Sequence, residues 1–194
     1  MAITAGYCTL AEIKAFRGVT DSSEDTMLER AVEAASRAID RYAGHPDGDF
    51  LLDSSTSTRT FQVCARGVEI RCDPIGTTTG LVLKPEAADG TLGTAITTYR
   101  TFPLNALTHS QPITRLVLTS GWMAQPYAQV TAKWGWPAVP AKVTQACLIL
   151  AARMAKRRES AEGTMGFGEF GMRISREDPD VVELLREFRP MLVG

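Results

Sequence analysis

Three patterns of hydrophobic and polar residues follow one another along the chain: helical spacing, then alternation, then helical spacing again. In the first stretch, apolar residues recur every three or four positions and form one stripe, made of Leu28, Ala31, Val32, Ala35, Ile39 and Tyr42. We expect the opposite face to be solvated; it carries Glu29, Arg30, Glu33, Arg37, Asp40 and Arg41. The pattern predicts an amphipathic helix that starts near Asp21–Ser23 and stops at Gly44 and Pro46.

A shorter helix is predicted before it. Thr9-Leu10-Ala11-Glu12 has the form of a capping box, in which the Thr9 hydroxyl accepts from the Glu12 amide and the Glu12 carboxylate accepts from the Thr9 amide. Gly18 can end this helix in the left-handed conformation. The front of the chain therefore reads as two consecutive helices.

The middle of the chain, from Phe50 to Tyr127, is rich in threonine, serine, glycine and proline. Short runs alternate with period two there, at Val68 to Cys72, 81–83, 95–99 and 113–118, and a further run covers 127–134. Asp89–Gly90 and Ser120–Gly121 are turn signals between such runs. The pattern predicts about five to six short antiparallel strands.

Helical spacing then resumes after Pro140, which suits a first turn. The apolar stripe of this helix is Val143, Ala146, Cys147, Leu150, Ala151 and Met154. A last helix is predicted to open at Asp178–Pro179 and to end at Pro190. We interpret Trp134 and Trp136, which precede the long helix, as packing residues at the joint, with contact to a partner as the alternative.

These elements predict an α+β fold: a small antiparallel helical bundle, formed by N- and C-terminal helices, is interrupted by a β-rich antiparallel insert. The expected organisation has four parts. Residues 1–49 form the N-terminal helices, 50–136 the insert, 137–160 the long C-terminal bundle helix, and 161–194 a glycine hinge with a terminal docking helix.

The run Gly166-Phe-Gly-Glu-Phe-Gly171 has the spacing G-x-G-x-x-G. A dinucleotide fingerprint needs a strand before it and a helix start after it, whereas this run follows a helical stretch and precedes residues without helix-start chemistry. We therefore interpret it as a hinge and expect no nucleotide or other cofactor.

Apolar side chains in and after this hinge are candidates for docking on another subunit. They are Phe167, Phe170, Met172, Val181, Leu184, Leu185 and Phe188. A short helix tethered by glycines has little local reason to stay folded, and a partner would supply apolar burial. The alternative is that the segment folds back on its own bundle.

Composition and charge restrict the partners and sites that can be expected. The formal net charge of −1 argues against non-specific nucleic-acid binding by a single copy. Arg153, Lys156, Arg157 and Arg158 form a basic helix end that could contact phosphates, or could simply be solvated. The four cysteines have no metal-site spacing, and we expect free thiols. No run reaches the length of a membrane span, and residues 1–4 do not resemble a signal peptide.

No sequence motif indicates a catalytic site. His45 and His109 lie beside turn-like residues without a cysteine or carboxylate pattern around them, so loop histidines are the expected interpretation. Asp178 and Asp180 flank Pro179, where helix capping explains them better than acid–base catalysis. We predict neither a catalytic residue nor a metal ligand.

Two parts of the sequence resemble a known family. Residues 7–14, Tyr-Cys-Thr-Leu-Ala-Glu-Ile-Lys, and residues 25–42, which end in Ala-Ala-Ser-Arg-Ala-Ile-Asp-Arg-Tyr, resemble the opening of tailed-phage head–tail connector (adaptor) proteins. Trp134-Gly-Trp-Pro, residues 140–158 and residues 163–189 resemble the version found in phages of actinobacteria. The resemblance covers both helical ends, and the β-rich middle is larger than in compact members.

The resemblance implies a structural virion protein without catalysis, made in the host cytoplasm. Members form a ring beneath the portal, usually twelvefold, which extends the DNA channel and receives a stopper or tail-completion protein. DNA would pass without sequence-specific contacts. The C-terminal hinge and helix would dock on the portal. Two alternatives stay open: another tail-completion or assembly protein, and a small cytosolic enzyme or ligand-binding domain with its site in the insert.

Overall fold

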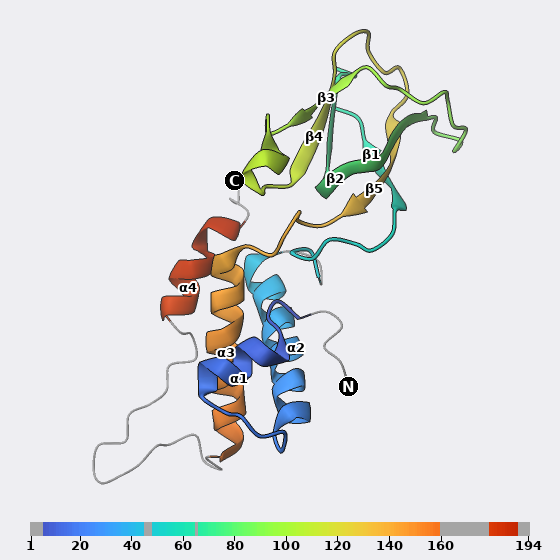
Figure 1. Ribbon diagram of the computed structural model, residues 1–194. Helices are drawn as coiled ribbons and strands as arrows, with labels where there is room; N and C mark the ends of the chain where they lie inside the picture. The colour runs from blue at the N-terminus through green and yellow to red at the C-terminus, as the bar shows by residue number, and fades with distance from the viewer. Residues whose placement is uncertain (1–5, 45–47, 65, 160–178, 190–194) are drawn as a thin grey trace. The chain divides into compact units, whose positions relative to one another are not determined.

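The structure, a computed structural model, describes residues 6–44, 48–64, 66–159 and 179–189, with side chains of the long helix described up to residue 156. The chain forms two compact units (Figure 1). The helical unit comprises Met1–Gly48 and Val139–Gly194, and the β unit comprises Asp49–Ala138. The predicted α+β class, with an antiparallel β-rich region between two helical regions, is confirmed.

The helical unit is built around one long helix. Helix α3 (Ala141–Glu159) packs against α1 (Leu10–Arg17), α2 (Asp25–Ala43) and α4 (Pro179–Leu185), and α4 continues into a 3-10 turn, η2 (Arg186–Phe188). The predicted stripe of α2 is buried apart from Tyr42, which is half-buried. On α3 the buried members of the stripe are Val143, Ala146, Cys147 and Ala151. The two stripes face a common core because three- and four-residue spacing keeps them on one side of each helix.

The helix ends follow local sequence chemistry. The capping box is present: Glu12 N donates to Thr9 Oγ1 at 3.2 Å, and Thr9 N donates to Glu12 Oε2 at 2.7 Å. Gly18, with φ 69°, and Gly44, with φ 72°, end α1 and α2 in the left-handed conformation that glycine favours. The start of α2 differs from the prediction. Asp21 accepts from Ser23 N in a preceding turn, and Asp25 is the first helical residue.

Glu12→Ala is expected to cost roughly 0.5–1 kcal/mol of stability at neutral pH, because it removes half of the capping box and a carboxylate at the positive helix end. Hydrogen bonds from Thr9 hold the pKa of Glu12 below its ordinary 4.5. A lowered folded-state pKa means that the contribution is complete above pH 4.5 and is lost as pH falls through the folded-state value. Urea unfolding at several pH values checks this. Thr9→Ala is the control: it also loses the hydroxyl bond to the Glu12 carboxylate, but its lost bond from the Glu12 amide does not titrate, so part of its cost should persist at low pH.

The β unit is one antiparallel sheet with the strand order β1-β5-β2-β4-β3. Its strands are β1 (Ser57–Gln62), β2 (Glu69–Glu86), β3 (Tyr99–Phe102), β4 (Ile113–Leu118) and β5 (Tyr127–Trp134), and a 3-10 turn, η1 (Ala106–His109), lies between β3 and β4. The first part of β2 pairs with β4, whereas its second part pairs with β5. A bridge between Val63 and Ile70 joins the end of β1 to the start of β2, so the sheet curls around a core.

Two details of the predicted strands are wrong. The runs at Val68 to Cys72 and 81–83 belong to one strand, because β2 continues through Gly76 and Gly80 with irregular register. The run 95–99 contributes only Tyr99 to a strand, although Ile96 forms a bridge with Leu83. Strand β1 was not among the predicted runs, because its polar sequence Ser-Thr-Arg-Thr-Phe-Gln carries almost no hydrophobic alternation.

The two tryptophans before α3 pack within the β unit. Trp134 is buried, and its indole N–H donates to the Ser57 carbonyl at 3.1 Å. Its ring centroid lies 5.5 Å from that of Phe61. Trp136 packs in the same way against Phe50, at 5.6 Å. Both rings therefore fix the last strand and the residues after it to the β unit's own core.

Candidate functional site

The C-terminal helix lies against the helical unit of its own subunit. Val181 and Leu185 on α4 are buried, and α4 packs mainly on α3 with a smaller contact to α2. Lys142 Nζ lies 2.8 Å from Glu187 Oε2. The Arg189 guanidinium lies 5.0 Å from the centroid of the Tyr42 ring, within cation–π range. The arrangement of residues 179–189 is thus the fold-back alternative that the sequence left open.

The predicted docking residues fall into three groups. Phe167, Phe170 and Met172 lie outside the described residues. Leu184 and Phe188 are half-buried. Val181 and Leu185 are 6% and 0% exposed, so they could meet a partner only if α4 left α3. Docking through any of the seven residues stays a prediction.

The predicted basic cluster lies at the end of α3. Lys156 is exposed and Arg153 is half-buried, one turn earlier on the helix. The backbone of Arg157 and Arg158 belongs to the last turn of α3, and their side chains lie outside the described part of the chain. Cations at this end complement the negative end of the helix dipole, which is the structural alternative to a phosphate contact.

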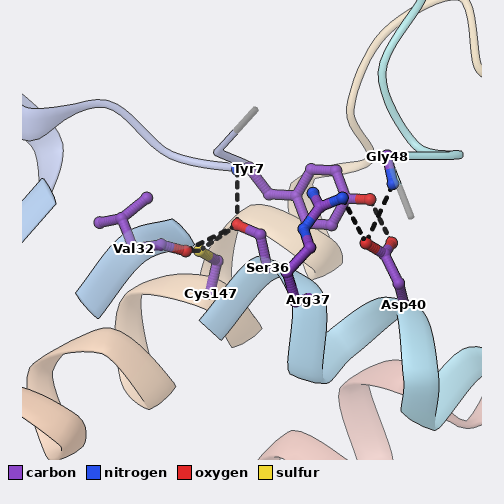
Figure 2. Close-up of polar contacts among 7 residues, drawn as sticks. All are labelled: Tyr7, Val32, Ser36, Arg37, Asp40, Gly48 and Cys147. Carbon is purple, nitrogen blue, oxygen red and sulfur yellow. Dashed lines mark hydrogen bonds and ion pairs between the residues drawn. The ribbon is translucent and has the colours of Figure 1, made fainter. Parts of the chain in front are cut away.

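A buried polar cluster joins the N-terminal segment to α2, and we call it the N-terminal clasp (Tyr7, Ser36, Arg37, Asp40 and Gly48; Figure 2). The Tyr7 amide donates to Ser36 Oγ at 3.0 Å, and the Tyr7 hydroxyl donates to Asp40. Asp40 also accepts from the Gly48 amide at 3.1 Å and from Arg37 Nη1 at 3.2 Å. Because Ser36 and Asp40 have no exposed surface, these bonds replace the hydration that both side chains lose on folding.

The position of Asp40 corrects the sequence analysis, which placed it on the solvated face of α2. Asp40 is fully buried, one position after Ile39 on the stripe. The available signal was the spacing of Ser36 and Asp40, which are four residues apart and therefore share a helix face. Their burial depends on Tyr7, which lies 33 residues before Asp40 and could not be placed from α2 alone.

Two cysteines lie beside the clasp. The Cys8 thiol donates to Cys147 Sγ at 3.5 Å, and Ser36 Oγ lies 3.5 Å from the same sulfur. The hydrogen bond from Cys8, followed by that from Ser36, lowers the pKa of Cys147 against the effect of burial. The same bond raises the pKa of Cys8, since Cys8 must keep its proton to donate it. All four cysteines are free thiols, as predicted.

The β unit presents several apolar side chains to solvent. Trp122 is 71% exposed and Leu104 is 59% exposed, with Leu92 and Tyr127 less so. A shallow hollow of about 310 Å³ is lined by Gln62, Val63, Cys64, Glu69 and Arg71. Burial opposes ionisation of Cys64, but the amides of Arg66, Glu69 and Val68 together lower the pKa of this exposed thiol.

Metal-ligating side chains do not gather into a cluster in the part of the chain that the structure describes. No group of three or more His, Cys, Asp or Glu side chains gathers closely enough there to hold a metal ion. His109 is exposed on η1, and His45 lies outside the described part. Within the described ranges, none of the helices has both the length and the apolar character needed to cross a membrane.

Comparison with known proteins finds a family match over the N-terminal part of the chain and a fold shared with solved neck structures. The family model of phage gp6-like head-tail connector proteins matches residues 7–67, a stretch that begins at Tyr7 of the clasp. The chain is also similar to a chain in a structure of the neck of an empty GTA particle computed with C6 symmetry. The two are 19% identical with a TM-score of 0.60, and the match covers 100% of this chain and 96% of that one.

A chain in the neck of a native GTA particle, computed with C12 symmetry, is similar as well, with 20% identity, a TM-score of 0.55 and coverage of 100% and 96%. At these identities the two structures establish a shared fold. No curated protein sequence matches the chain. The matched family model describes head-tail connector proteins. The resemblance to tailed-phage head–tail connector proteins that the sequence predicts is therefore confirmed.

Proposed function

We propose that this protein is a virion component at the head–tail interface, where twelve copies form a ring beneath the portal and extend the DNA channel. The observation that carries the proposal is the match of residues 7–67 to the phage gp6-like head-tail connector family. That stretch contains α1, α2 and the clasp residue Tyr7, so the match falls on elements that organise the helical unit.

The fold supports a ring. A neck chain of the same fold, matched over 100% of this chain, was computed with C12 symmetry. Closed rings use head-to-tail interfaces, in which two different surfaces of each copy meet and the rotation closes. Further partners in this proposal are the portal above and a stopper or tail-completion protein below. DNA passes through the channel, and Arg153, Lys156, Arg157 and Arg158 would contact its phosphates without sequence specificity.

Co-assembly tests the proposal directly. Purified protein mixed with portal rings from the same particle should yield a complex whose mass exceeds that of the portal by twelve subunits, measured by native mass spectrometry. Electron microscopy of the complex should place the added ring on the tail-facing side. Portal rings that stay unchanged in mass at micromolar protein would rule the proposal out.

The proposal assigns portal docking to the C-terminal segment, and α4 and η2 offer a test within the described residues. We expect Leu184→Ala combined with Phe188→Ala to abolish portal binding. The subunit itself should lose only about 1.5–3 kcal/mol of stability, because both side chains are half-buried in the free protein. Co-sedimentation with portal rings measures binding, and urea unfolding measures stability.

The matched control lies on the same helical segment. Glu183 and Arg186 form an exposed pair at 3.7 Å, with side chains 77% and 79% exposed. Glu183→Ala with Arg186→Ala should change neither stability nor binding appreciably, since exposed pairs contribute little. A Leu184/Phe188 double variant that is less stable yet binds portal rings normally would show that α4 serves only its own subunit.

A further inference from the structure

We propose that Cys8 and Cys147 form an oxidisable dithiol, and that peroxide converts it into a disulfide that fastens the N-terminal segment to α3. The two sulfurs lie 3.5 Å apart, although 139 residues separate them in the sequence. Both side chains are buried, at 4% and 0% exposure, in the described core of the helical unit. The sequence alone does not predict this pairing, because the two cysteines share no local motif.

The surrounding contacts bring the two sulfurs close to one another. Cys147 lies on α3, and its thiol also contacts the Val32 carbonyl of α2 at 3.8 Å (Figure 2). Cys8 lies between Tyr7, whose amide is bonded to Ser36, and Thr9, which caps α1. A disulfide needs sulfurs about 2.05 Å apart. Side-chain rotation and a small shift of the segment around Cys8 close the remaining distance.

The Cys8 thiol donates to Cys147 Sγ, and this geometry favours Cys147 as the sulfur that reacts first. Thiolates, and not thiols, are the nucleophiles in cysteine chemistry. Cys147 Sγ accepts a hydrogen bond from the Cys8 thiol, and this bond favours its ionised form. Because Cys147 is fully buried, the proposal takes as oxidant hydrogen peroxide, which is much smaller than glutathione.

The reaction balances with peroxide as the only oxidant. The Cys147 thiolate attacks one peroxide oxygen, the O–O bond breaks, and hydroxide leaves and takes up a proton to give water, so that Cys147 becomes a sulfenic acid. The Cys8 sulfur then attacks the Cys147 sulfur, the S–O bond breaks, and the hydroxide leaves with the Cys8 proton as a second water. Two thiols and one peroxide give one disulfide and two waters, and the two sulfurs supply two electrons.

The other two cysteines serve as internal references. Burial raises the pKa of Cys72 to about 12, so it should stay a thiol. Cys64 is exposed and has a lowered pKa, so peroxide will add oxygen to it. Cys64→Ser therefore provides a clean background, and the serine hydroxyl can still accept from the Glu69 amide that bonds to Cys64.

The experiment treats the folded Cys64→Ser protein with hydrogen peroxide and follows its intact mass. The expected product is lighter by two hydrogen atoms, and digestion should yield a peptide pair linked through Cys8 and Cys147. The thermal midpoint of the helical unit should rise, because the link closes a long loop in the unfolded chain, and dithiothreitol should return it to the starting value. Cys8→Ser in the same background should instead gain oxygen at Cys147.

Two results would overturn the proposal. One is a treated protein that keeps both thiols, shown by their alkylation after unfolding. The other is addition of oxygen to Cys147 without a Cys8–Cys147 link while Cys8 is present. Either result would mean that the two sulfurs do not react with one another in the folded protein.

Discussion

Replacing Gly135 with alanine is expected to unfold the β unit, at a cost of at least about 4 kcal/mol. Gly135 follows β5 with φ 106°, a conformation that L-residues rarely adopt. A Cβ placed there would lie 1.7 Å from the Leu51 carbonyl oxygen, far inside contact distance. The backbone has no room to yield, because Gly135 N donates to the Pro74 carbonyl at 2.8 Å and Trp134 O accepts from Asp53 N at 2.8 Å.

Tryptophan fluorescence reports unfolding of the β unit specifically. The three tryptophans of the chain, at positions 122, 134 and 136, all belong to the β unit. Gly90→Ala is the matched control. Gly90 also has positive φ, at 84°, but nothing lies within 4 Å of the position that an alanine methyl group would take, so only the conformational cost of about 1–2 kcal/mol applies. Equal urea midpoints for the two variants would contradict the close approach at Gly135.

Asp40→Ala is expected to cost about 3–5 kcal/mol in the helical unit, because it removes a fully buried carboxylate that accepts from three donors. Asp40 has no exposed surface. Its loss would remove the bonds made to it by the Tyr7 hydroxyl, the Gly48 amide and Arg37. Urea unfolding followed by far-ultraviolet circular dichroism measures the cost. Asp40→Asn should lie between the variant and the native protein, since it keeps the shape but not the charge.

Asp25→Ala gives the comparison on the same helix. Asp25 pairs with Lys14 at 2.6 Å, but its side chain is 30% exposed, so the loss should stay near 1 kcal/mol. If Asp40→Ala were no more harmful than Asp25→Ala, the bonds to Asp40 would contribute little to holding the N-terminal segment.

The helices were predictable because their signals are local. Thr9 and Glu12, which cap the start of α1, are three residues apart. Gly18 and Gly44 end α1 and α2 through their own backbone conformation, so no distant residue is needed to predict these helix ends. The apolar stripes of α2 and α3 are read in the same way from spacing along one helix. The resemblance to connector proteins rests on these same stretches, and it is confirmed.

The strands and the clasp depend on partners far away in the sequence. The polar strand β1 exists because β5, some seventy residues later, pairs with it from Ser57↔Ala132 to Gln62↔Tyr127. Strand β2 runs through its glycines because β4 and β5 pair with its two parts. Asp40 looks like a surface residue until Tyr7 is placed over it. Docking through the hinge residues Phe167, Phe170 and Met172 stays a prediction, because they lie outside the described residues.

The helical unit is discontinuous in sequence, and this has a consequence for synthesis. Helices α1 and α2 leave the ribosome first, but α3, which covers the stripe of Leu28, Val32 and Ile39, follows only after residues 49–138. At typical elongation rates the delay is about 5–20 s. During that interval the nascent chain exposes an apolar helix surface, which makes it a substrate for cellular chaperones, while the β unit can already fold as a continuous segment.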